Sequence, residues 1–466
     1  MWQLTERIDI RQPPAVVFDY LSHFDTIREW DRTVVRSRMT TPGPPAVGSR
    51  FALLLAFGGT HIPMTYEIVS ITPPAAIELK GTADSFTAVD RIRLDAIPGG
   101  TRLTYRADVV FRRQPPTGVN AVARTLFRFS ARRAVKRLQR LLSGSDPAPR
   151  LTLAARMADQ AIFPGLLGFT RLGYHLAVNR RPVASRLYSG RTMVLTGGTS
   201  GIGEAAARQL HALGAHLVVV GRSNQKLVRL RDQLEKAGSG RVHTERADLS
   251  LTSDIRNLAA RINRRFGRID VLINNAGALF NRYGRTVEGN EKTLATNLLG
   301  PYLLTRLLLP SLQAAGEGRV INVASGGMYT QGIRLDALQS DPEAHDGPAA
   351  YARAKRGLVI LTGLWAQQWA PQGIRVHAMH PGWVDTPGLE KALPAFHRQL
   401  SRWLRTSAQG ADTIVWLAAS PDAGRASGQF WLDRKIRATH VFPGTRESSY
   451  DRRALVAALD SLSGLG

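Results

Sequence analysis

The sequence predicts two fold classes in one chain: an α+β domain, then an α/β domain with a doubly wound parallel sheet. Up to about residue 143 the chain alternates in strand-like runs separated by turn residues. From Arg191 onward short apolar runs alternate with helical stretches, which is typical of a parallel sheet. The length of 466 residues suggests two or three domains. We therefore expect domains at residues 1–144 and 190–466, joined by a connector at residues 145–189.

The chain is strongly basic, with 62 lysine and arginine residues against 36 acidic ones, which gives a formal net charge of +26. This balance favours anionic partners such as nucleic acid, an acidic membrane surface or a phosphorylated ligand. The arginines are spread over the whole chain, so a proteome-wide arginine bias explains the charge at least as well as nucleic-acid binding does. No helix-turn-helix, zinc finger or aromatic stacking platform is visible, so we expect no nucleic-acid partner.

The sequence contains no cysteine, which excludes disulfides and thiolate metal sites and fits a reducing compartment. The N-terminus lacks an apolar signal region behind a basic start. No stretch reaches the ~20 uninterrupted apolar residues of a membrane span. We therefore expect a cytoplasmic protein, with peripheral contact to a membrane as the alternative.

The first domain is predicted from a series of strand-like runs between two helical stretches. Thr101–Phe111 alternates apolar and polar residues, as a half-buried antiparallel strand does. One helical stretch begins after Pro14, and a long helical run, Val119–Leu142, closes the domain. This order predicts an α+β fold in which a sheet wraps around one helix. The other strand-like runs are Glu6–Ile10, Phe51–Phe57, Met64–Ile71 and Ala88–Ile97.

Four segments carry a resemblance for this domain: PPAVVFDYLSHFDTIREWD, GSRF, YEIVSITPPAAIEL and TRLTYRADV. Together they resemble the polyketide cyclase/START-like (SRPBCC) superfamily over roughly the first third of the chain. The resemblance implies a helix-grip fold with an apolar cavity between the curved sheet and the closing helix, where a hydrophobic ligand is held. A packing or assembly module is the alternative, and we favour the ligand cavity.

The closing helix and the connector each allow two interpretations. In the helix we favour a core-facing apolar stripe with a solvated basic back over a surface that docks on anionic lipid. In the connector, Leu151–Val178 is apolar but is interrupted by Arg171 and His175. It either packs on a domain or forms a membrane-surface or substrate-entrance element. The helix has basic residues Arg112, Arg113, Arg124, Arg128, Arg132, Arg133, Lys136, Arg137 and Arg140, and apolar residues Val122, Leu126, Phe129, Val135, Leu138 and Leu142.

A glycine-rich turn follows the first apolar run of the second domain. Thr192–Thr196 reads as a buried strand, and Gly-Gly-Thr-Ser-Gly-Ile-Gly then leads into a helical stretch at Glu204–Leu213. Such a turn lets the backbone approach a pyrophosphate, and the helix N-terminus donates N–H groups to it. The sequence therefore predicts a dinucleotide site of the Rossmann type. Further buried strands are predicted at His216–Val220, Val271–Ile273 and Val320–Val323.

The end of the second strand indicates which dinucleotide binds. A carboxylate there would take the ribose hydroxyls of NAD, but Arg222 occupies the position and Lys226 follows one turn later. A guanidinium matches the 2′-phosphate of NADP. A surface arginine in an arginine-rich protein is the alternative. The position favours the phosphate, so we predict NADP (NADPH) over NAD.

Tyr351 and Lys355 form the predicted chemical centre. A spacing of four residues puts both side chains on one helical face. A free tyrosine has a pKa of about 10, too high for a proton acceptor at neutral pH. A neighbouring ammonium stabilises the phenolate and lowers that pKa. This pair therefore fits acid–base catalysis.

Together these motifs resemble the short-chain dehydrogenase/reductase family from about Arg191 to Arg437, and the C-terminal segments resemble most the subgroup of dehydrogenase/reductase SDR family member twelve. The resemblance implies that Ser325 polarises the substrate carbonyl and that Asn297 holds a proton-relay water. Alone, Ser325 would read as a cap and Asn297 as a packing residue. For the cofactor the assigned residues are Thr196, Gly197, Thr199, Ser200, Gly201, Ile202, Gly203, Arg222, Asp248, Leu249, Asn275, Ala276, Gly277, Tyr351, Lys355, Pro381, Gly382, Val384 and Thr386.

Four further expectations concern the surroundings of the site and the assembly of the chain. Residues 387–407 would form the substrate lid, and an insertion, Met328–Pro348, would border the substrate through Tyr329, Leu335 and Leu338. We interpret His377 and His380 as core or strand-end residues, and we expect no metal site. By the same resemblance, homo-oligomers would form through the predicted helices Thr286–Leu312 and Ala349–Trp369.

The motifs predict reversible hydride transfer between NADP(H) and an apolar carbonyl or secondary alcohol. Tyr351 would deliver the proton, and the first domain suggests a lipid, sterol or polyketide as the hydrophobic substrate. The alternative is a lipid-binding or transfer protein whose dehydrogenase half binds NADP(H) without turnover. The intact Asn/Ser/Tyr/Lys set argues against it.

Overall fold

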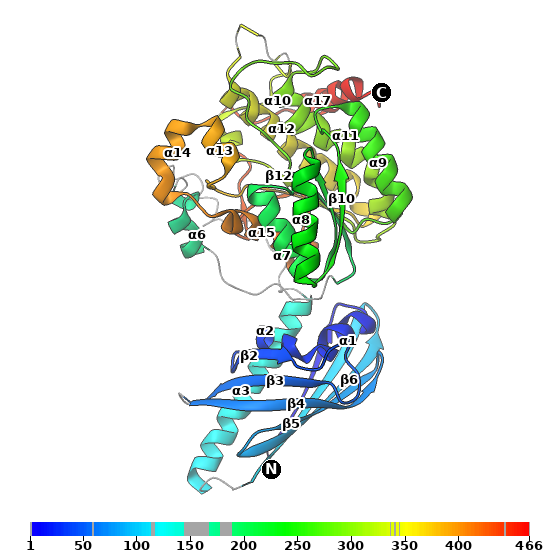
Figure 1. Ribbon diagram of the computed structural model, residues 1–466, viewed down its shortest axis with the longest axis vertical. Coiled ribbons are helices and arrows are strands. Elements are labelled where there is room, and N and C mark those ends of the chain that lie inside the picture. Colours follow the sequence, from blue (N-terminus) through cyan, green and yellow to red (C-terminus); the bar gives the residue numbers. More distant parts are fainter. Residues whose placement is uncertain are drawn as a thin grey trace. The chain divides into compact units, whose positions relative to one another are not determined.

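The computed structural model describes residues 2–57, 60–112, 117–143, 167–177, 189–335, 337–339, 342–343, 345–441 and 444–465 (Figure 1). The chain divides into two compact units, one built mainly from residues up to 143 and the other mainly from residues after 188. Most of the predicted connector lies outside the described residues. Its described part, 167–177, belongs to the second unit.

The first unit is a seven-stranded antiparallel sheet with the order β1-β7-β6-β5-β4-β3-β2. The alternation expected for Thr101–Phe111 is present, because Leu103, Tyr105, Ala107 and Val109 are all buried on one face of β7. The elements are β1 (Trp2–Ile10), α1 (Pro14–Ser22), α2 (Ile27–Trp30), β2 (Val34–Met39), β3 (Arg50–Phe57), β4 (Thr60–Thr72), β5 (Ala76–Thr82), β6 (Phe86–Ile97), β7 (Gly100–Phe111) and α3 (Thr117–Ser143).

The long helix α3 packs against β1 (Figure 1). Its C-terminal half buries Val135, Leu138 and Leu142, and the side chains of Lys136 and Arg140 between them are exposed. Arg137 is half-buried, and its Nη1 donates to the carbonyl oxygen of Trp30 at 3.0 Å. Phe129 departs from the predicted stripe: its side chain is exposed, and the Arg133 guanidinium lies 4.2 Å from the ring centroid. The stripe therefore faces the core only in this half of the helix. The side chains of Val122 and Leu126 lie outside the described residues.

The second unit is a doubly wound sheet with the order β10-β9-β8-β11-β12-β13-β14-β15, parallel except for β15. The first half contains α6 (Arg171–Ala177), β8 (Thr192–Thr196), α7 (Gly201–Ala212), β9 (His216–Gly221), α8 (Asn224–Ala237), β10 (Arg241–Arg246), α9 (Thr252–Phe266), β11 (Val271–Asn274), α10 (Lys292–Leu294), the π-helical turn η2 (Ala295–Leu299) and α11 (Gly300–Gln313). The second half contains β12 (Arg319–Val323), η3 (Gly326–Thr330), α12 (Gly347–Gln368), β13 (Arg375–Met379), α13 (Pro387–Ala392), α14 (Pro394–Leu400), α15 (Ser407–Ala419), β14 (Gln429–Leu432), β15 (Lys435–Arg437) and α17 (Ser449–Ser463).

Helices cover both faces of this sheet. α9, α11 and α12 enclose one core, and α7, α8 and α15 pack on the other side (Figure 1). The C-terminal helix α17 adds a layer over α12 and η2, and buries Leu455 and Leu459 in the same core as α11 and α12. Within the described parts of the chain, no helix is long and apolar enough to cross a bilayer.

Candidate active site

A groove of about 280 Å³ lies at the carboxyl ends of the parallel strands, where dinucleotides bind in open α/β sheets. It gathers residues from five separate segments that the sequence assigned to the cofactor. The predicted cofactor residues that line it are Gly197, Thr199, Ser200, Gly201, Ile202, Gly203, Arg222, Asp248, Leu249, Asn275, Ala276, Gly277 and Thr386.

The glycine turn between β8 and α7 has no room for side chains. Gly197 has a φ of +66°, and a Cβ on it would lie 2.8 Å from the Cα of Ala276. A Cβ on Gly203 would collide with the carbonyl oxygen of Gly197. The backbone is therefore packed as closely as a pyrophosphate cradle requires, and the N-terminus of the twelve-residue helix α7 opens into the groove.

Asn275 fastens this turn to the end of β11. Its amide nitrogen Nδ2 donates to the carbonyl oxygens of Thr196 and Gly197, at 2.9 and 3.2 Å. Its backbone N–H donates to Oγ1 of Thr196 at 3.0 Å, and the N–H of Ala276 shares that acceptor. Asn275 thus holds the floor of the groove in a fixed position relative to the glycine turn.

The adenosine end of the groove is basic. Arg222 lines it just beyond β9, and a neighbouring cavity of about 220 Å³ is lined by Lys226 and Arg229 from α8. The two cavities share the wall formed by Thr199, Ser200 and Gly201. Asp248 also lines the groove, and its Oδ1 accepts hydrogen bonds from the N–H and hydroxyl of Ser250.

The side chains of Tyr351 and Ser325 meet next to the end of β12. Ser325 follows β12 and caps η3, where its Oγ accepts a long 3.3 Å hydrogen bond from the N–H of Gly327. Tyr351 lies in α12. Burial raises the pKa of Tyr351 to about 12, and a hydrogen bond with the Ser325 side chain opposes this shift. The two hydroxyls are therefore close enough to share one oxygen acceptor.

Lys355 lies one turn after Tyr351, and its side chain is almost fully buried. Its Nζ donates to the carbonyl oxygen of Val323 at 2.8 Å and lies 5.6 Å from the centroid of the Tyr351 ring. Burial lowers the pKa of the Lys355 ammonium to about 8. The lowering of the Tyr351 pKa by the Lys355 ammonium stays a prediction.

Asn297 is fully buried in the π-helical turn η2, a widened turn that is often found at functional sites. Its Nδ2 donates to the carbonyl oxygens of Ala278 and Thr293, and its Oδ1 accepts from the N–H of Ala278 at 3.1 Å. A Cβ on Gly277 would lie 2.8 Å from Oδ1 of Asn297 and 3.0 Å from Nζ of Lys355. The structure thus brings Asn297 and Lys355 together around Gly277.

In the loop after β13, one predicted cofactor residue lines the groove and the others pack against neighbouring parts of the fold. Thr386 lines the groove and caps α13 through a 3.2 Å bond from the N–H of Leu389. Val384 is buried, and its side chain packs where a Cβ on Gly410 would lie. Pro381 and Gly382 contact Arg405: the Pro381 carbonyl oxygen accepts from its guanidinium at 3.2 Å.

Two expectations about the surroundings were tested by burial. The insertion side chains are core residues instead of a substrate border: Leu338 is buried and Leu335 is partly buried in the α11–α12 core, and the Tyr329 hydroxyl donates to the Ala438 carbonyl. His377 and His380 are buried, as expected. Burial lowers the pKa of His377 to about 3 and that of His380 well below its usual value. Among the described residues no cluster of acidic and histidine side chains could hold a metal ion.

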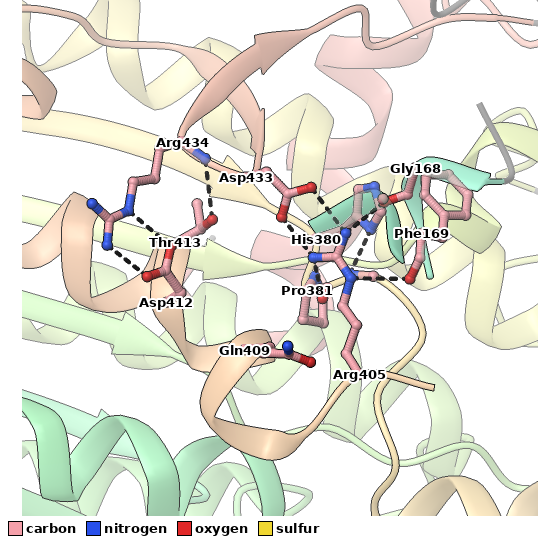
Figure 2. Close-up of polar contacts among 12 residues, drawn as sticks. Gly168, Phe169, His380, Pro381, Arg405, Gln409, Asp412, Thr413, Asp433 and Arg434 are labelled. Carbon is pink, nitrogen blue, oxygen red and sulfur yellow. Dashed lines mark hydrogen bonds and ion pairs between the residues drawn. The ribbon is translucent and has the colours of Figure 1, made fainter. Parts of the chain in front are cut away.

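Sequence reasoning missed a buried ion pair beside the site. Arg405 forms two hydrogen bonds with Asp433, Nη1–Oδ1 at 2.6 Å and Nη2–Oδ2 at 2.9 Å, and both side chains are about 1% exposed (Figure 2). No motif marks Arg405, because one arginine among many carries no signal of burial. Asp433 and Arg434 follow the apolar run FWL and precede KIR, in which polar and apolar residues alternate, so a hairpin turn was the only available clue.

The fold and the groove define a nicotinamide-dependent oxidoreductase. A short chain dehydrogenase family model matches residues 191–395, and a model for polyketide cyclase/dehydrase and lipid transport matches residues 1–143. Dehydrogenase/reductase SDR family member 12 of Bos taurus is 38% identical over 64% of this chain and 95% of its own length. Retinol dehydrogenase 14 of Mus musculus is 31% identical over 57% of this chain and 84% of its own length. Polyprenol dehydrogenase of Homo sapiens is 30% identical over 54% of this chain and 79% of its own length.

The chain belongs to the short-chain dehydrogenase/reductase family, and its first 143 residues form a polyketide cyclase-like domain. It is an NAD(P)-dependent dehydrogenase/reductase.

Proposed function

We propose that the protein interconverts an apolar carbonyl compound and the corresponding alcohol, secondary from a ketone and primary from an aldehyde, with NADP(H) as cofactor. The observation that supports NADP(H) is the basic end of the groove, where Arg222 stands at the strand end and Lys226 and Arg229 line the adjoining cavity. A ribose 2′-phosphate needs cationic donors at this position, whereas a ribose 2′-hydroxyl needs a carboxylate.

The residues present fit such a cofactor. The glycine turn leaves the backbone bare at Gly197 and Gly203, and the N-terminus of α7 favours an anionic pyrophosphate. Arg222 would hold the 2′-phosphate, and Asp248 would face the adenine. At the other end, Gly277 and Thr386 border the space for the nicotinamide half.

When bound, NADPH supplies the hydride to the carbonyl carbon. Ser325 donates a hydrogen bond to the carbonyl oxygen and polarises it, and Tyr351 donates the proton that converts this oxygen to a hydroxyl. The hydrogen bond between these two side chains supports a shared target. Asn297, buried beside Lys355 across Gly277, would hold the water that returns a proton toward Tyr351.

The apolar substrate is supported by the relatives and by the first domain. Two relatives are named for retinol and polyprenol, both apolar alcohols. The polyketide cyclase-like unit packs α3 on a seven-stranded antiparallel sheet, and the helix-grip fold that its resemblance implies would hold a hydrophobic ligand. We propose that this unit binds a ligand of the same apolar class.

The first test is a fluorescence titration of the purified chain with NADPH and, in parallel, with NADH. We expect NADPH to bind more tightly, and Arg222→Ala to weaken NADPH by roughly tenfold to hundredfold, because hydrogen bonds to a charged group contribute about 1.5–3 kcal/mol. NADH binding should change little. Arg231→Ala is the matched control, since Arg231 lies on α8 but pairs with Asp232.

The result against this assignment would be equal affinity for the two cofactors in the wild type, or an Arg222→Ala protein that keeps its preference for NADPH. In the first case the cofactor is not selected by its 2′-phosphate. In the second case Lys226 and Arg229 select it without Arg222.

A further inference from the structure

Three aromatic side chains from distant parts of the chain meet beside Ser325. The ring centroids of Phe169 and Trp383 are 5.7 Å apart, and those of Trp383 and Phe396 are 5.3 Å apart, both in edge-to-face geometry. Phe169 comes from the described end of the connector, Trp383 from the loop after β13, and Phe396 from α14 in the predicted lid. All three rings are partly exposed, so this row presents an apolar aromatic surface.

Phe169 brings this aromatic row to the catalytic serine. A Cβ on Gly326, the residue directly after Ser325, would lie 3.0 Å from Cε2 and 3.2 Å from Cζ of Phe169. The ring also packs edge-to-face on buried His380, with centroids 4.5 Å apart, and against the cluster around Met328. Phe169 is therefore fixed at the backbone position that aims the Ser325 hydroxyl.

Arg405 fixes the connector segment that carries Phe169 (Figure 2). Its Nε donates to the carbonyl oxygens of Phe169 and Thr170 at 3.0 and 3.2 Å, and its Nη2 donates to that of Gly168. The N–H of Trp383 donates to the Phe169 carbonyl oxygen at 2.8 Å. A buried guanidinium needs a hydrogen-bond acceptor for each of its N–H groups. Asp433 accepts only some of these hydrogen bonds, and the carbonyl oxygens of the connector segment accept others.

The carboxylate of Asp433 is itself held by a tight turn between β14 and β15. Asp433 and Arg434 have φ values of +53° and +60°, a conformation that non-glycine residues seldom adopt. Arg434 forms a fork-like ion pair with Asp412 on α15, at 2.6 and 2.8 Å (Figure 2). Two ion pairs thus hold the turn in the conformation that presents Asp433 to Arg405.

We infer that Phe169 is a specificity-determining residue of the dehydrogenase: with Trp383 and Phe396 it forms the wall against which the apolar body of the substrate packs while its carbonyl meets Ser325. Arg405 and Asp433 are positioning residues for that wall. This inference rests on the proposed function and deepens it. The wall would favour substrates that carry a broad, flat apolar group next to the carbonyl. A small ketone does not reach the wall and gains nothing from it.

The test compares two probes, all-trans-retinal as a large apolar carbonyl and cyclohexanone as a small one, by NADPH oxidation with the full chain. For Phe169→Ala we expect KM for retinal to rise roughly tenfold or more, because an apolar pocket that loses several carbons discriminates at that level. The ratio of kcat/KM for retinal to kcat/KM for cyclohexanone should fall by a similar factor, because only retinal reaches the wall, and the Kd for NADPH should stay within about twofold. Phe169→Leu should fall between the wild type and Phe169→Ala.

Leu176→Ala is the matched control, because Leu176 lies in the same connector segment and is 79% exposed. Its kinetics should equal those of the wild type. Asp433→Asn, which keeps the size of the side chain but weakens the ion pair, should raise KM for retinal with a smaller effect on kcat. An unchanged KM for retinal in Phe169→Ala overturns the inference.

A wild type that binds NADPH but reduces no carbonyl overturns the proposed function instead. The wall is then tested by binding alone: retinol is added to the protein with and without NADP⁺, and the difference between the two changes in retinol fluorescence is measured. This measurement does not require turnover. Loss of this signal in Phe169→Ala, with retention in Leu176→Ala, supports the wall. An unchanged signal in Phe169→Ala, or no NADP⁺-dependent signal in the wild type, overturns it.

Discussion

Tyr351 and Lys355 contact groups that are distant from them in sequence, Ser325 and the carbonyl oxygen of Val323. The four-residue spacing predicts that Tyr351 and Lys355 share a face of one helix, and both lie in α12. It does not predict that Lys355 donates to the carbonyl of Val323, because the sheet brings that strand end to the helix across 32 residues of chain. Motif spacing therefore identifies the chemical groups, while tertiary packing decides which atoms they bind.

Removal of the Tyr351 hydroxyl tests its role as proton donor. We expect Tyr351→Phe to lower kcat by roughly 10²–10⁴-fold, the usual contribution of a positioned acid or base. NADPH affinity should stay within about twofold, since the ring remains. Tyr450→Phe serves as the control because Tyr450 is 69% exposed on α17. Undiminished turnover of the Tyr351 variant in a steady-state assay would rule out this assignment.

The strands show what periodicity can predict at the scale of one element. Long strands with clear alternation, such as β6 and β7, were predicted to within two residues of their observed bounds. The edge strand β2, VVRSRM, was not predicted, because most of its side chains are exposed or half-buried and its residues lack apolar alternation. β2 is held by backbone hydrogen bonds to β3, and such bonds do not depend on which residue types form them.

The π-helical turn η2 is a second element that the sequence could not predict. The resemblance selected Asn297, but the widened turn depends on contacts between η2, α12 and the loop at Gly277. Hydrogen bonds from the Asn297 side chain to Ala278 join this turn to the end of β11. The turn is therefore a consequence of tertiary packing around one asparagine.

β6 also carries an unexpected carboxylate on its inward face. Asp90 is buried, and burial raises its pKa to about 6, against hydrogen bonds from Tyr66 and Tyr105 that lower it. The folded state therefore binds the proton more tightly than the unfolded state. Ionised Asp90 therefore lowers the free energy of unfolding. This loss is absent below pH ~4, grows as the pH rises to about 6, and amounts to about 3 kcal/mol above that.

We expect Asp90→Asn to raise the free energy of unfolding of the first unit at pH 7.5 by up to about 3 kcal/mol and to leave it nearly unchanged at pH 4. Denaturant titrations at the two pH values would measure the difference. Asp95→Asn, on the same strand and exposed, is the control and should show no such pH dependence. A destabilised Asp90→Asn protein at pH 7.5 would mean that the tyrosine hydrogen bonds outweigh the burial.

At the scale of the whole molecule, α17 changes the expectation about assembly. This helix packs within the chain on α12 and η2, and its apolar side chains join the core that these elements share with α11. Leu455 and Leu459 are fully buried there, and the Tyr302 hydroxyl donates to Asp460 at 2.6 Å. The sequence analysis predicted no element for Ser449–Ser463, and the packing of α17 on the rest of the second unit was therefore not predicted.

We therefore predict that α11 and α12 do not form a subunit interface while α17 is in place. Light scattering should give the mass of one chain for the wild type, and deletion of residues 448–466 should produce larger species by exposing the apolar surface under Leu455 and Leu459. The point variant Leu459→Ala should only destabilise the fold, by about 2–5 kcal/mol, without association. A deleted chain that stays soluble at the mass of one chain would contradict the prediction.

The hydrogen bonds from Arg405 to the connector segment can form only late in the synthesis of the chain. Gly168 and Arg405 are 237 residues apart in sequence, and Asp433 follows still later. A chain emerging from the ribosome exposes Tyr351 and Lys355 well before it can close the wall beside Ser325, since domains fold largely as their last segments arrive. A nascent or prematurely ended chain thus contains Tyr351 and Lys355 but lacks Arg405 and Asp433, the two residues that hold the proposed substrate wall in place.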